Sequence, residues 1–204
     1  MPYQTNDYHP AFEEYCETIF ELKEDGVKVI QARIVERLQV SRPAVSEMIK
    51  KMKDAGLVLI DGTEISLSEK GSRLANQVVR RHRLAERFLT DILGLSWAEA
   101  HHEAGKWEHV VSPRVEAAFL KLLEDPTTCP HGNPIPGSDY QTPEGTSALA
   151  EISIGNGFVI ERIPEELEFQ AGLLEFIEES NLIPGENGTV TSLTPDATTT
   201  DDVK

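Results

Sequence analysis

The spacing of apolar residues along the first seventy positions predicts three helices followed by a hairpin. The helical pattern stops at the turn signal Asp25-Gly26 and then resumes. A third helical stretch begins after Ser41, a typical N-cap residue, with Pro43 in its first turn. Two short apolar runs flank Asp61-Gly62, which is typical of a tight hairpin turn. The helices are expected over residues 12–24, 30–40 and 42–55, and the strands over 57–60 and 65–67. This order predicts a winged helix-turn-helix, with a small helical domain and an unrelated hairpin as the alternative.

Beyond the hairpin the pattern changes from helical to mixed. Helices are expected over residues 71–93, 96–111 and 113–124, and prolines and glycines between 126 and 137 then exclude a further helix. Strands are expected near 148–154, 157–160 and 189–193, with a helix near 173–177. The chain is therefore expected to be mainly α, with a small β domain near its C-terminal end and a disordered polar tail at 195–204.

The charge of the chain is unevenly distributed. A net charge of −16 argues against a nucleic-acid partner, but residues 141–204 alone contribute −11 of it. Residues 28–53 carry seven basic and two acidic residues, and salt screening confines exposed charge to about 10 Å, so this face can still bind phosphate. The sequence offers no membrane span, no signal peptide and only two cysteines, Cys16 and Cys129, so a cytoplasmic protein without disulfides is expected.

The helix after Ser41 carries most of the residues expected to contact DNA. In a helix-turn-helix the second helix enters the major groove with its N-terminal end, where small polar side chains approach bases and phosphates. The candidate DNA-binding residues are Arg33, Ser41, Arg42, Pro43, Ala44, Ser46, Glu47 and Lys50. Taken singly, Ser41 could be only a helix cap and Lys50 only a solvated surface residue. The order of the elements and the basic stripe together predict double-stranded operator DNA as the partner.

Carboxylates and histidines gather at helical spacing in three places. Glu14 and Glu17 lie three residues apart on the first helix, and His82 and Glu86 lie four apart on the long helix, so each pair shares a helix face. The third group comprises His101, His102, Glu103, Glu108 and His109. Oxygen and imidazole donors suit divalent manganese, iron, cobalt and zinc, and clustered carboxylates repel one another without a cation. The set predicts a metal site shared by three helices, although any one of these histidines alone is more often structural.

Four segments of the sequence resemble one known family. They are ARIVERLQVSRPAVSEMIKKMKDAGLV, RRHRLAERFLTDILGL, AHHEAGKWEHVVS and HGNPIPG, within about residues 12 to 137. They are similar to metal-dependent repressors of the diphtheria toxin repressor and manganese transport regulator family. The resemblance implies a winged-helix DNA-binding domain at 1–73, a helical dimerisation and metal-binding domain at 74–140 and an SH3-like domain at 147–194. Almost nothing strand-like follows Leu193, so the last domain is expected to be shortened, incomplete or only partly ordered.

The resemblance implies a primary metal site between helix one and a Glu-His pair. Its residues are Glu14, Glu17, Gly105, Glu108 and His109. Iron-type members have methionine and cysteine at the positions of Glu14 and Gly105, whereas Glu17 matches a carboxylate of manganese-type members. Manganese-type members have a glutamate where Gly105 stands, and glycine offers only its carbonyl. Water, or a larger contribution from Glu14 and Glu17, is therefore expected to complete the site.

The resemblance also implies an ancillary metal site. In iron-type members it corresponds to His82, Glu86, His101, Glu165 and Glu168, the last two from the SH3-like domain. In manganese-type members without that domain, the equivalent of His82 belongs to a closely spaced binuclear pair, and the sequence leaves both geometries open. Two metal ions per subunit are expected.

Together these features predict a homodimeric, metal-dependent transcriptional repressor of metal-homeostasis genes. A divalent ion would tether helix one to the dimerisation domain and set the spacing of two recognition helices. The expected ligands favour Mn(II) first and Fe(II) second. The alternative is a metal-dependent hydrolase built on His82, Glu86, His101, Glu108 and His109, but the sequence offers no HExxH, nucleophile elbow or phosphate loop. A redox sensor using Cys16 and Cys129 is disfavoured, because neither thiol has an evident partner nearby in sequence.

Overall fold

The N-terminal part of the computed structural model, which describes residues 10–193, is a winged helix-turn-helix. Its elements are α1 (Pro10–Glu24), α2 (Gln31–Leu38), α3 (Arg42–Asp54), β1 (Val58–Asp61) and β2 (Glu64–Leu67). The side chain of Ser41 caps α3 by accepting a hydrogen bond from the backbone of Ala44. The two strands pair antiparallel with Val58 opposite Leu67. The predicted order of elements is confirmed.

Apolar residues from each of these helices and from the start of the wing form one core. Ile19, Ile34, Val45, Ile49 and Leu57 are each at most 1% exposed. Burying one such side chain contributes about 1.5–3 kcal/mol, and each lies where the periodicity requires an apolar residue. Because these residues hold α3 by its inner face, its polar face is left toward solvent.

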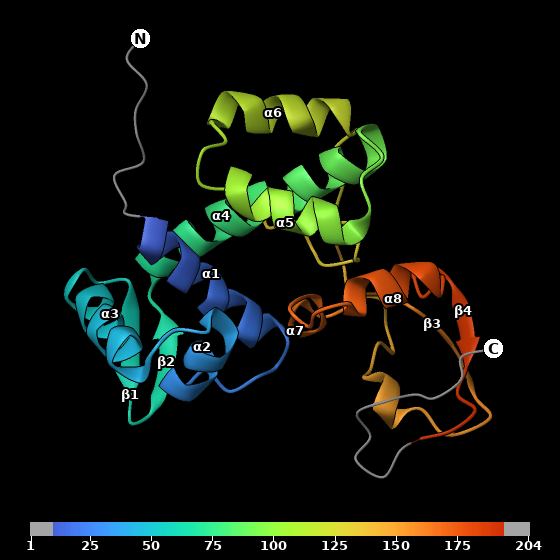
Figure 1. The fold of residues 1–204 in the computed structure, drawn as a ribbon, viewed down its shortest axis with the longest axis horizontal. Helices are drawn as coiled ribbons and strands as arrows, with labels where there is room; N and C mark the ends of the chain where they lie inside the picture. The colour runs from blue at the N-terminus through green and yellow to red at the C-terminus, as the bar shows by residue number, and fades with distance from the viewer. Residues whose placement is uncertain (1–9, 194–204) are drawn as a thin grey trace.

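The middle of the chain is a stack of helices joined to the first part by one long helix, α4 (Figure 1). The bounds are α4 (Glu69–Arg87), η1 (Phe88–Ile92), α5 (Trp97–Trp107) and α6 (Pro113–Leu122). The long helix expected over 71–93 therefore ends in a π-helical turn, η1, in place of a regular α-helical end. The boundary expected between residues 73 and 74 falls inside α4, so both parts of the chain share this helix.

The C-terminal part differs from the sequence prediction. Its elements are η2 (Leu149–Glu151), β3 (Gly157–Val159), α7 (Glu165–Glu168), α8 (Leu173–Glu179) and β4 (Asn187–Thr189). The strand expected near 148–154 is a single 3-10 turn, because within residues 10–193 no strand pairs with that segment. β3 pairs antiparallel with β4, which begins before the expected strand, and the sequence analysis missed α7. The expected SH3-like domain stays a prediction, and the tail at 195–204 lies outside the described residues.

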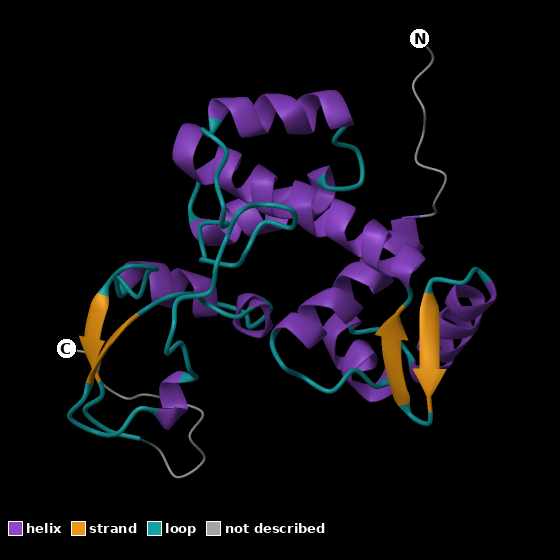
Figure 2. Cartoon of the chain, turned by 180° about the vertical axis from the view of Figure 1, so that it is seen from behind, coloured by secondary structure: helices purple, strands orange, loops and turns teal. Residues whose placement is uncertain are grey.

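The two small sheets lie on opposite sides of the molecule, and α7 lies between them (Figures 1 and 2). α7 packs against both α1 and α8, so the C-terminal part reaches the first helix of the chain. No helix between residues 10 and 193 combines the length and apolar character needed to cross a membrane. This placement of α7 brings its two buried glutamates, Glu165 and Glu168, toward α4 and α5.

Gly71, in the first turn of α4, is expected to tolerate no side chain. A Cβ at this position would lie 2.1 Å from the backbone carbonyl oxygen of Leu57. Because a backbone oxygen cannot swing aside, Gly71→Ala should lower the free energy of unfolding by about 2 kcal/mol.

Gly105→Ala on α5 is the matched control, since no atom lies within 4 Å of the added Cβ. Helix propensity favours alanine there by about 1 kcal/mol, so this variant should be neutral or slightly more stable. Urea unfolding of both metal-free variants, followed by circular dichroism, measures the difference. Equal stabilities would contradict the close packing of α4 on the strand that follows Leu57.

Candidate metal centre

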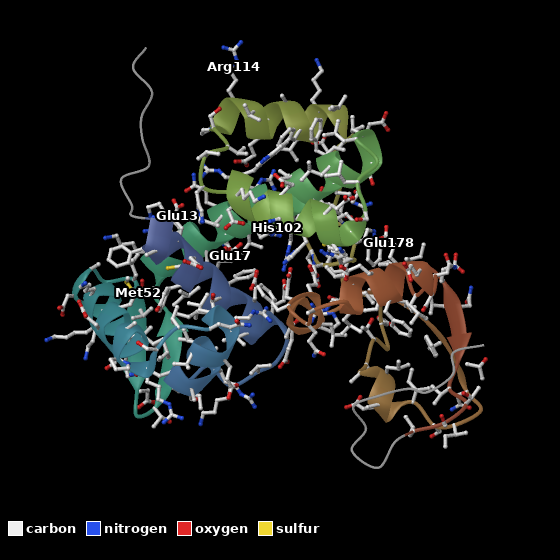
Figure 3. The ribbon with its side chains drawn as sticks, viewed as in Figure 1. Glu13, Glu17, Met52, His102, Arg114 and Glu178 are labelled. Carbon is white, nitrogen blue, oxygen red and sulfur yellow. The ribbon has the colours of Figure 1, made fainter. Side chains whose placement is uncertain are left out.

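Three buried carboxylates lie along one face of α1. Glu13, Glu17 and Glu21 are spaced four residues apart, which places them on a common helix face, and none is more than 8% exposed. Glu13 Oε2 lies 2.7 Å from Nδ1 of His109, and Glu21 accepts a hydrogen bond of 3.1 Å from Arg37. Glu13 and Glu17 are labelled along α1 in Figure 3. Buried carboxylates need positive partners, so this face of α1 can pack only where cations or protons meet it.

The first candidate metal group lies between α1, α4 and the end of α5. It consists of Glu17, His82 and Glu108, whose donor atoms lie within 4.8 Å of one another. Nδ1 of His82 is 2.5 Å from Oε2 of Glu108, and Nε2 of His109 is 3.1 Å from Oε1 of the same carboxylate. Burial and the neighbouring Glu108 raise the pKa of Glu17 well above its usual value. Glu17 Oε1 has no hydrogen-bond partner among the described residues, so this group has an unused oxygen donor.

Three residues of the expected primary site lie outside this group: His109, which contacts Glu108 at its edge, and Glu14 and Gly105, which are farther from it. Glu14 is exposed, because the helical rotation of 100° per residue carries it off the face that Glu13 and Glu17 share. The pKa of His109 is raised mainly by the hydrogen bond that its ring donates to Glu13, while burial acts to lower it; the charge of Glu14 adds a smaller upward effect. Gly105 is exposed on α5 and faces open space. The structure thus brings Glu13 to His109, which the sequence analysis missed, and leaves Glu14 and Gly105 as predicted ligands only.

The second candidate metal group is more enclosed and joins α4, α5 and α7. Glu86 Oε1 lies 3.0 Å from Nδ1 of His101 and 3.1 Å from Nε2 of His82. Glu168 Oε2 lies 3.1 Å from the same nitrogen of His101 and 3.0 Å from Nδ1 of His131. The side chains of Glu86, Glu168 and His131 have no solvent exposure. The residues expected on three separate elements, His82, Glu86, His101 and Glu168, therefore do meet.

Cys129 and His131 belong to this second group although the sequence analysis did not assign them. Both are fully buried in the proline-rich segment, with Cys129 Sγ 3.8 Å from Nδ1 of His131. Together with Glu86 they offer three donor atoms within 4.8 Å of one another. The view of Cys129 as a thiol without a partner is therefore corrected. The Cys-x-His spacing, which ends on the first residue of the HGNPIPG motif, was the available signal, whereas only the fold brings Glu86 beside it.

Glu165 and Glu168 have different surroundings on α7. Glu165 Oε1 accepts a hydrogen bond of 2.8 Å from Arg83, while its Oε2 has no hydrogen-bond partner in the described part of the chain. Burial and the charge of Glu168 raise the pKa of Glu165 to about 8. Glu168 accepts a hydrogen bond of 2.9 Å from Asn133 and faces the histidines. Glu168 is thus oriented toward the second group, whereas one oxygen of Glu165 is hydrogen-bonded to Arg83.

His82 connects the two groups. Its Nδ1 faces Glu108 of the first group, and its Nε2 faces Glu86 of the second. Burial alone would lower its pKa, but the two carboxylates raise it well above the usual value, so the ring is an imidazolium in the metal-free protein. A metal ligand must present an unprotonated nitrogen. The unpartnered oxygens Glu17 Oε1 and Glu86 Oε2 and the histidine-carboxylate donor set fit one or two divalent ions in this cluster.

The predicted DNA-contacting residues form an exposed polar surface at the edge of the molecule where α3 lies (Figure 1). The exposed residues are Arg33, Ser41, Arg42, Pro43, Ala44, Ser46, Glu47 and Lys50. Glu47 forms an ion pair of 2.7 Å with Lys51, and Arg33 forms one of 2.9 Å with Glu36. Their exposure is compatible with DNA contact, and their role in it stays a prediction.

A winged helix-turn-helix joined by one helix to a buried histidine-carboxylate cluster defines the class of metal-binding winged-helix regulators. The chain belongs to the iron-dependent repressor family, which includes the diphtheria toxin repressor. The N-terminal DNA-binding domain of that family matches residues 7–63, and its metal-binding and dimerisation domain matches residues 68–137.

Individual relatives are named for two different metals. The chain is 39% identical to the iron-dependent repressor IdeR of Mycobacterium leprae over 196 residues, covering 91% of this chain and 85% of IdeR. It is 48% identical to the diphtheria toxin repressor of Corynebacterium diphtheriae over 145 residues, covering 71% and 59% of the two chains. A manganese-dependent transcriptional repressor solved with manganese superimposes with a TM-score of 0.78 at 33% identity, covering 89% and 83%. Membership of the family therefore leaves the choice between iron and manganese open.

Metal binding to the second group is expected to release protons. Burial acts to lower the pKa of His101, but hydrogen bonds with Glu168 and Glu86 raise it to about 10, so the metal-free ring is charged near neutral pH. A metal ion bound through Nδ1 of His101 displaces the proton on that nitrogen. The affinity for Mn(II) should therefore rise with pH, by about tenfold per pH unit for each proton released.

Titration calorimetry in buffers of different ionisation enthalpy counts the protons released at saturating Mn(II). His101→Gln removes one titrating ring and should release about one proton fewer. The neighbouring His102→Gln is the matched control, since His102 is exposed on α5 (Figure 3) and should leave the count unchanged. Equal proton counts for the His101 variant and the unaltered protein would contradict the assignment.

Proposed function

We propose that this chain is a homodimeric transcriptional repressor that binds operator DNA of metal-homeostasis genes when it carries a divalent metal ion. The main support is that α1 takes part in both functions of the molecule. It packs into the core of the winged helix-turn-helix through Ile19, and on another face it presents Glu17 to the first candidate metal group and Glu13 to His109 beside that group. A ligand that holds this face against α5 also holds the DNA-binding part of the chain.

The activation mechanism follows from repulsion between buried carboxylates. When bound, a divalent ion supplies the positive charge that Glu17 and Glu108 lack. Those two side chains, whose donor atoms lie within 4.8 Å of each other, would then be held together without mutual repulsion, and His109 stays close to the same face of α1. With α1 held, the recognition helices α3 of the two subunits keep one spacing, which suits two half-sites about 34 Å apart on DNA. Metal binding thus shifts the population toward the DNA-binding arrangement.

Two ions per subunit and a preference for Mn(II) over Fe(II) belong to the same proposal. The first group, with Glu14 as a further ligand, contains only oxygen and nitrogen donors, which suits Mn(II). The second group adds the Cys129 thiol, which shifts that group toward softer ions such as Fe(II), Co(II) and Zn(II). The hydrolase alternative gains no support, since the family consists of DNA-binding repressors.

His82→Gln should abolish most of the metal dependence of operator binding, because it removes a nitrogen donor from both groups. We expect the Mn(II)-dependent gain in affinity to fall by at least about tenfold. His102→Gln, the same substitution at the exposed position of α5, should change the gain by less than about threefold. Fluorescence anisotropy with DNA from upstream of a metal-transporter gene measures the gain, and circular dichroism checks the fold.

Glu17→Gln provides a second variant if His82→Gln fails to fold, because it changes only one oxygen of the first group. Glu17→Gln should also reduce the Mn(II)-dependent gain in operator affinity. A Glu17 variant that binds operator DNA only with metal, as tightly as the unaltered protein, would show that the first group is not the activating site.

Cys129→Ser should change metal preference more than overall stability. Replacing the soft sulfur donor should weaken Co(II) and Zn(II) binding by at least about tenfold and Mn(II) binding by less than about threefold. The thiolate-to-Co(II) charge-transfer absorption of the loaded protein should disappear in this variant and persist in Cys16→Ser, whose thiol is buried in the apolar core. Persistence of that absorption in Cys129→Ser would exclude Cys129 as a ligand.

A further inference from the structure

One aromatic side chain lies between the second metal group and the winged helix-turn-helix. Phe169 directly follows Glu168 at the end of α7. Its ring meets the ring of His101 edge-on, with centroids 5.4 Å apart and planes at 89°. The guanidinium carbon of Arg37, on α2, lies 3.8 Å from the centroid of the same ring. A single ring therefore contacts a candidate metal ligand of α5 and a helix of the DNA-binding part.

Arg37 is held on two sides. Its side chain is 5% exposed, and its Nη2 lies 3.1 Å from a carboxylate oxygen of Glu21, which is also buried. Its Nε has no hydrogen-bond partner within residues 10–193. A guanidinium removed from water interacts more strongly with an aromatic face than an exposed one does. Because α2 packs directly on α3, a force on Arg37 acts on the recognition helix as well.

The position of Phe169 depends on Glu168. The Glu168 side chain has no solvent exposure and faces His101 and His131, which together lower the pKa of its carboxyl against burial and the nearby charge of Glu86. A divalent ion bound between Glu168 and Glu86 would take over the role of these positive rings and hold the end of α7 in place. Since Phe169 is the next residue along the chain, its ring would then be held against Arg37.

Core packing does not account for Phe169. Phe169 is 47% exposed and lies outside the C-terminal apolar cluster, whose buried members are Trp97, Ile163, Leu174 and Ile177. A ring that fills a core contacts apolar side chains on most sides, whereas this ring contacts an arginine and a histidine. Its neighbours therefore indicate a linking role.

We infer that Phe169 is a positioning residue for metal activation: occupancy of the second group seats its ring on Arg37 and so restrains α2 and the adjoining recognition helix. This inference rests on the proposed function, because it explains how the second group reaches the DNA-binding part. The contact between Phe169 and Arg37 would couple the second metal group to the DNA-binding part of the chain, in addition to the coupling of the first metal group through α1.

The test compares Phe169→Leu with Phe176→Leu in the full-length protein. Phe176 is 58% exposed and lies on α8, so it is the matched control for the loss of an exposed aromatic ring. Hydrogen exchange of the α2 amides is measured with and without Mn(II). Mn(II) should slow this exchange by about tenfold in the unaltered protein and in Phe176→Leu, but by less than about threefold in Phe169→Leu. Phe169→Tyr keeps the aromatic face and should behave like the unaltered protein.

Titration calorimetry with Mn(II) separates coupling from metal loss. Phe169→Leu should bind Mn(II) with an affinity within about threefold of the unaltered protein, while its Mn(II)-dependent gain in operator affinity falls by about tenfold. If the variant keeps the Mn(II)-dependent protection of α2, or loses Mn(II) affinity in proportion to that protection, the coupling role is wrong. If the unaltered protein shows no metal-dependent operator binding, the proposed function fails instead, and the exchange measurement still decides whether Phe169 restrains α2.

Discussion

Carboxylates from separate helices can share a dry interior only where positive charge lies between them. In this chain α1, α4, α7 and the residue directly after α5 each contribute at least one buried glutamate to the same region, and the packing of these elements depends on how those charges are balanced. Histidines provide part of the balance through protonated rings that contact two carboxylates at once, as His82 does. The protons on these histidine rings supply positive charge that a bound metal ion could replace.

Arginine provides the part of the balance that cannot be exchanged. Arg83 has no solvent exposure and bridges Glu24 at the end of α1, at 2.6 Å, and Glu165 of α7, at 2.8 Å. Arg162 adds an ion pair of 3.0 Å with Asp25 on the same corner. Because a guanidinium stays protonated at any physiological pH, this corner holds the C-terminal part to α1 whether or not metal is present. The histidine-carboxylate cluster beside it can therefore lose and regain its cation without the C-terminal part leaving the molecule.

The location of the two kinds of charge explains why metal binding can act on DNA binding. Permanent ion pairs keep α7 near α1, and the exchangeable cluster sets how closely α1, α5 and α7 approach one another. On the proposed mechanism, small changes in that approach act on α3 through two packed contacts, the apolar core around Ile19 and the contact of Arg37 with Phe169. A two-fold related recognition surface is sensitive to such changes, because both helices must fit the DNA at once.

Helical periodicity and turn signals were enough to predict α1 to α6 and the wing, because each of these elements buries a face that its own sequence defines. The same local spacing identified His82 with Glu86, and the family resemblance identified the Glu108-His109 pair and Glu168 as candidate ligands. Tertiary structure alone decided that Glu13 meets His109 while Glu14 is exposed, and that Cys129 and His131 close the second group. Local sequence determines which face of a helix is polar, but the partner of a buried charge comes from a distant segment, and only the packing of the whole chain selects it.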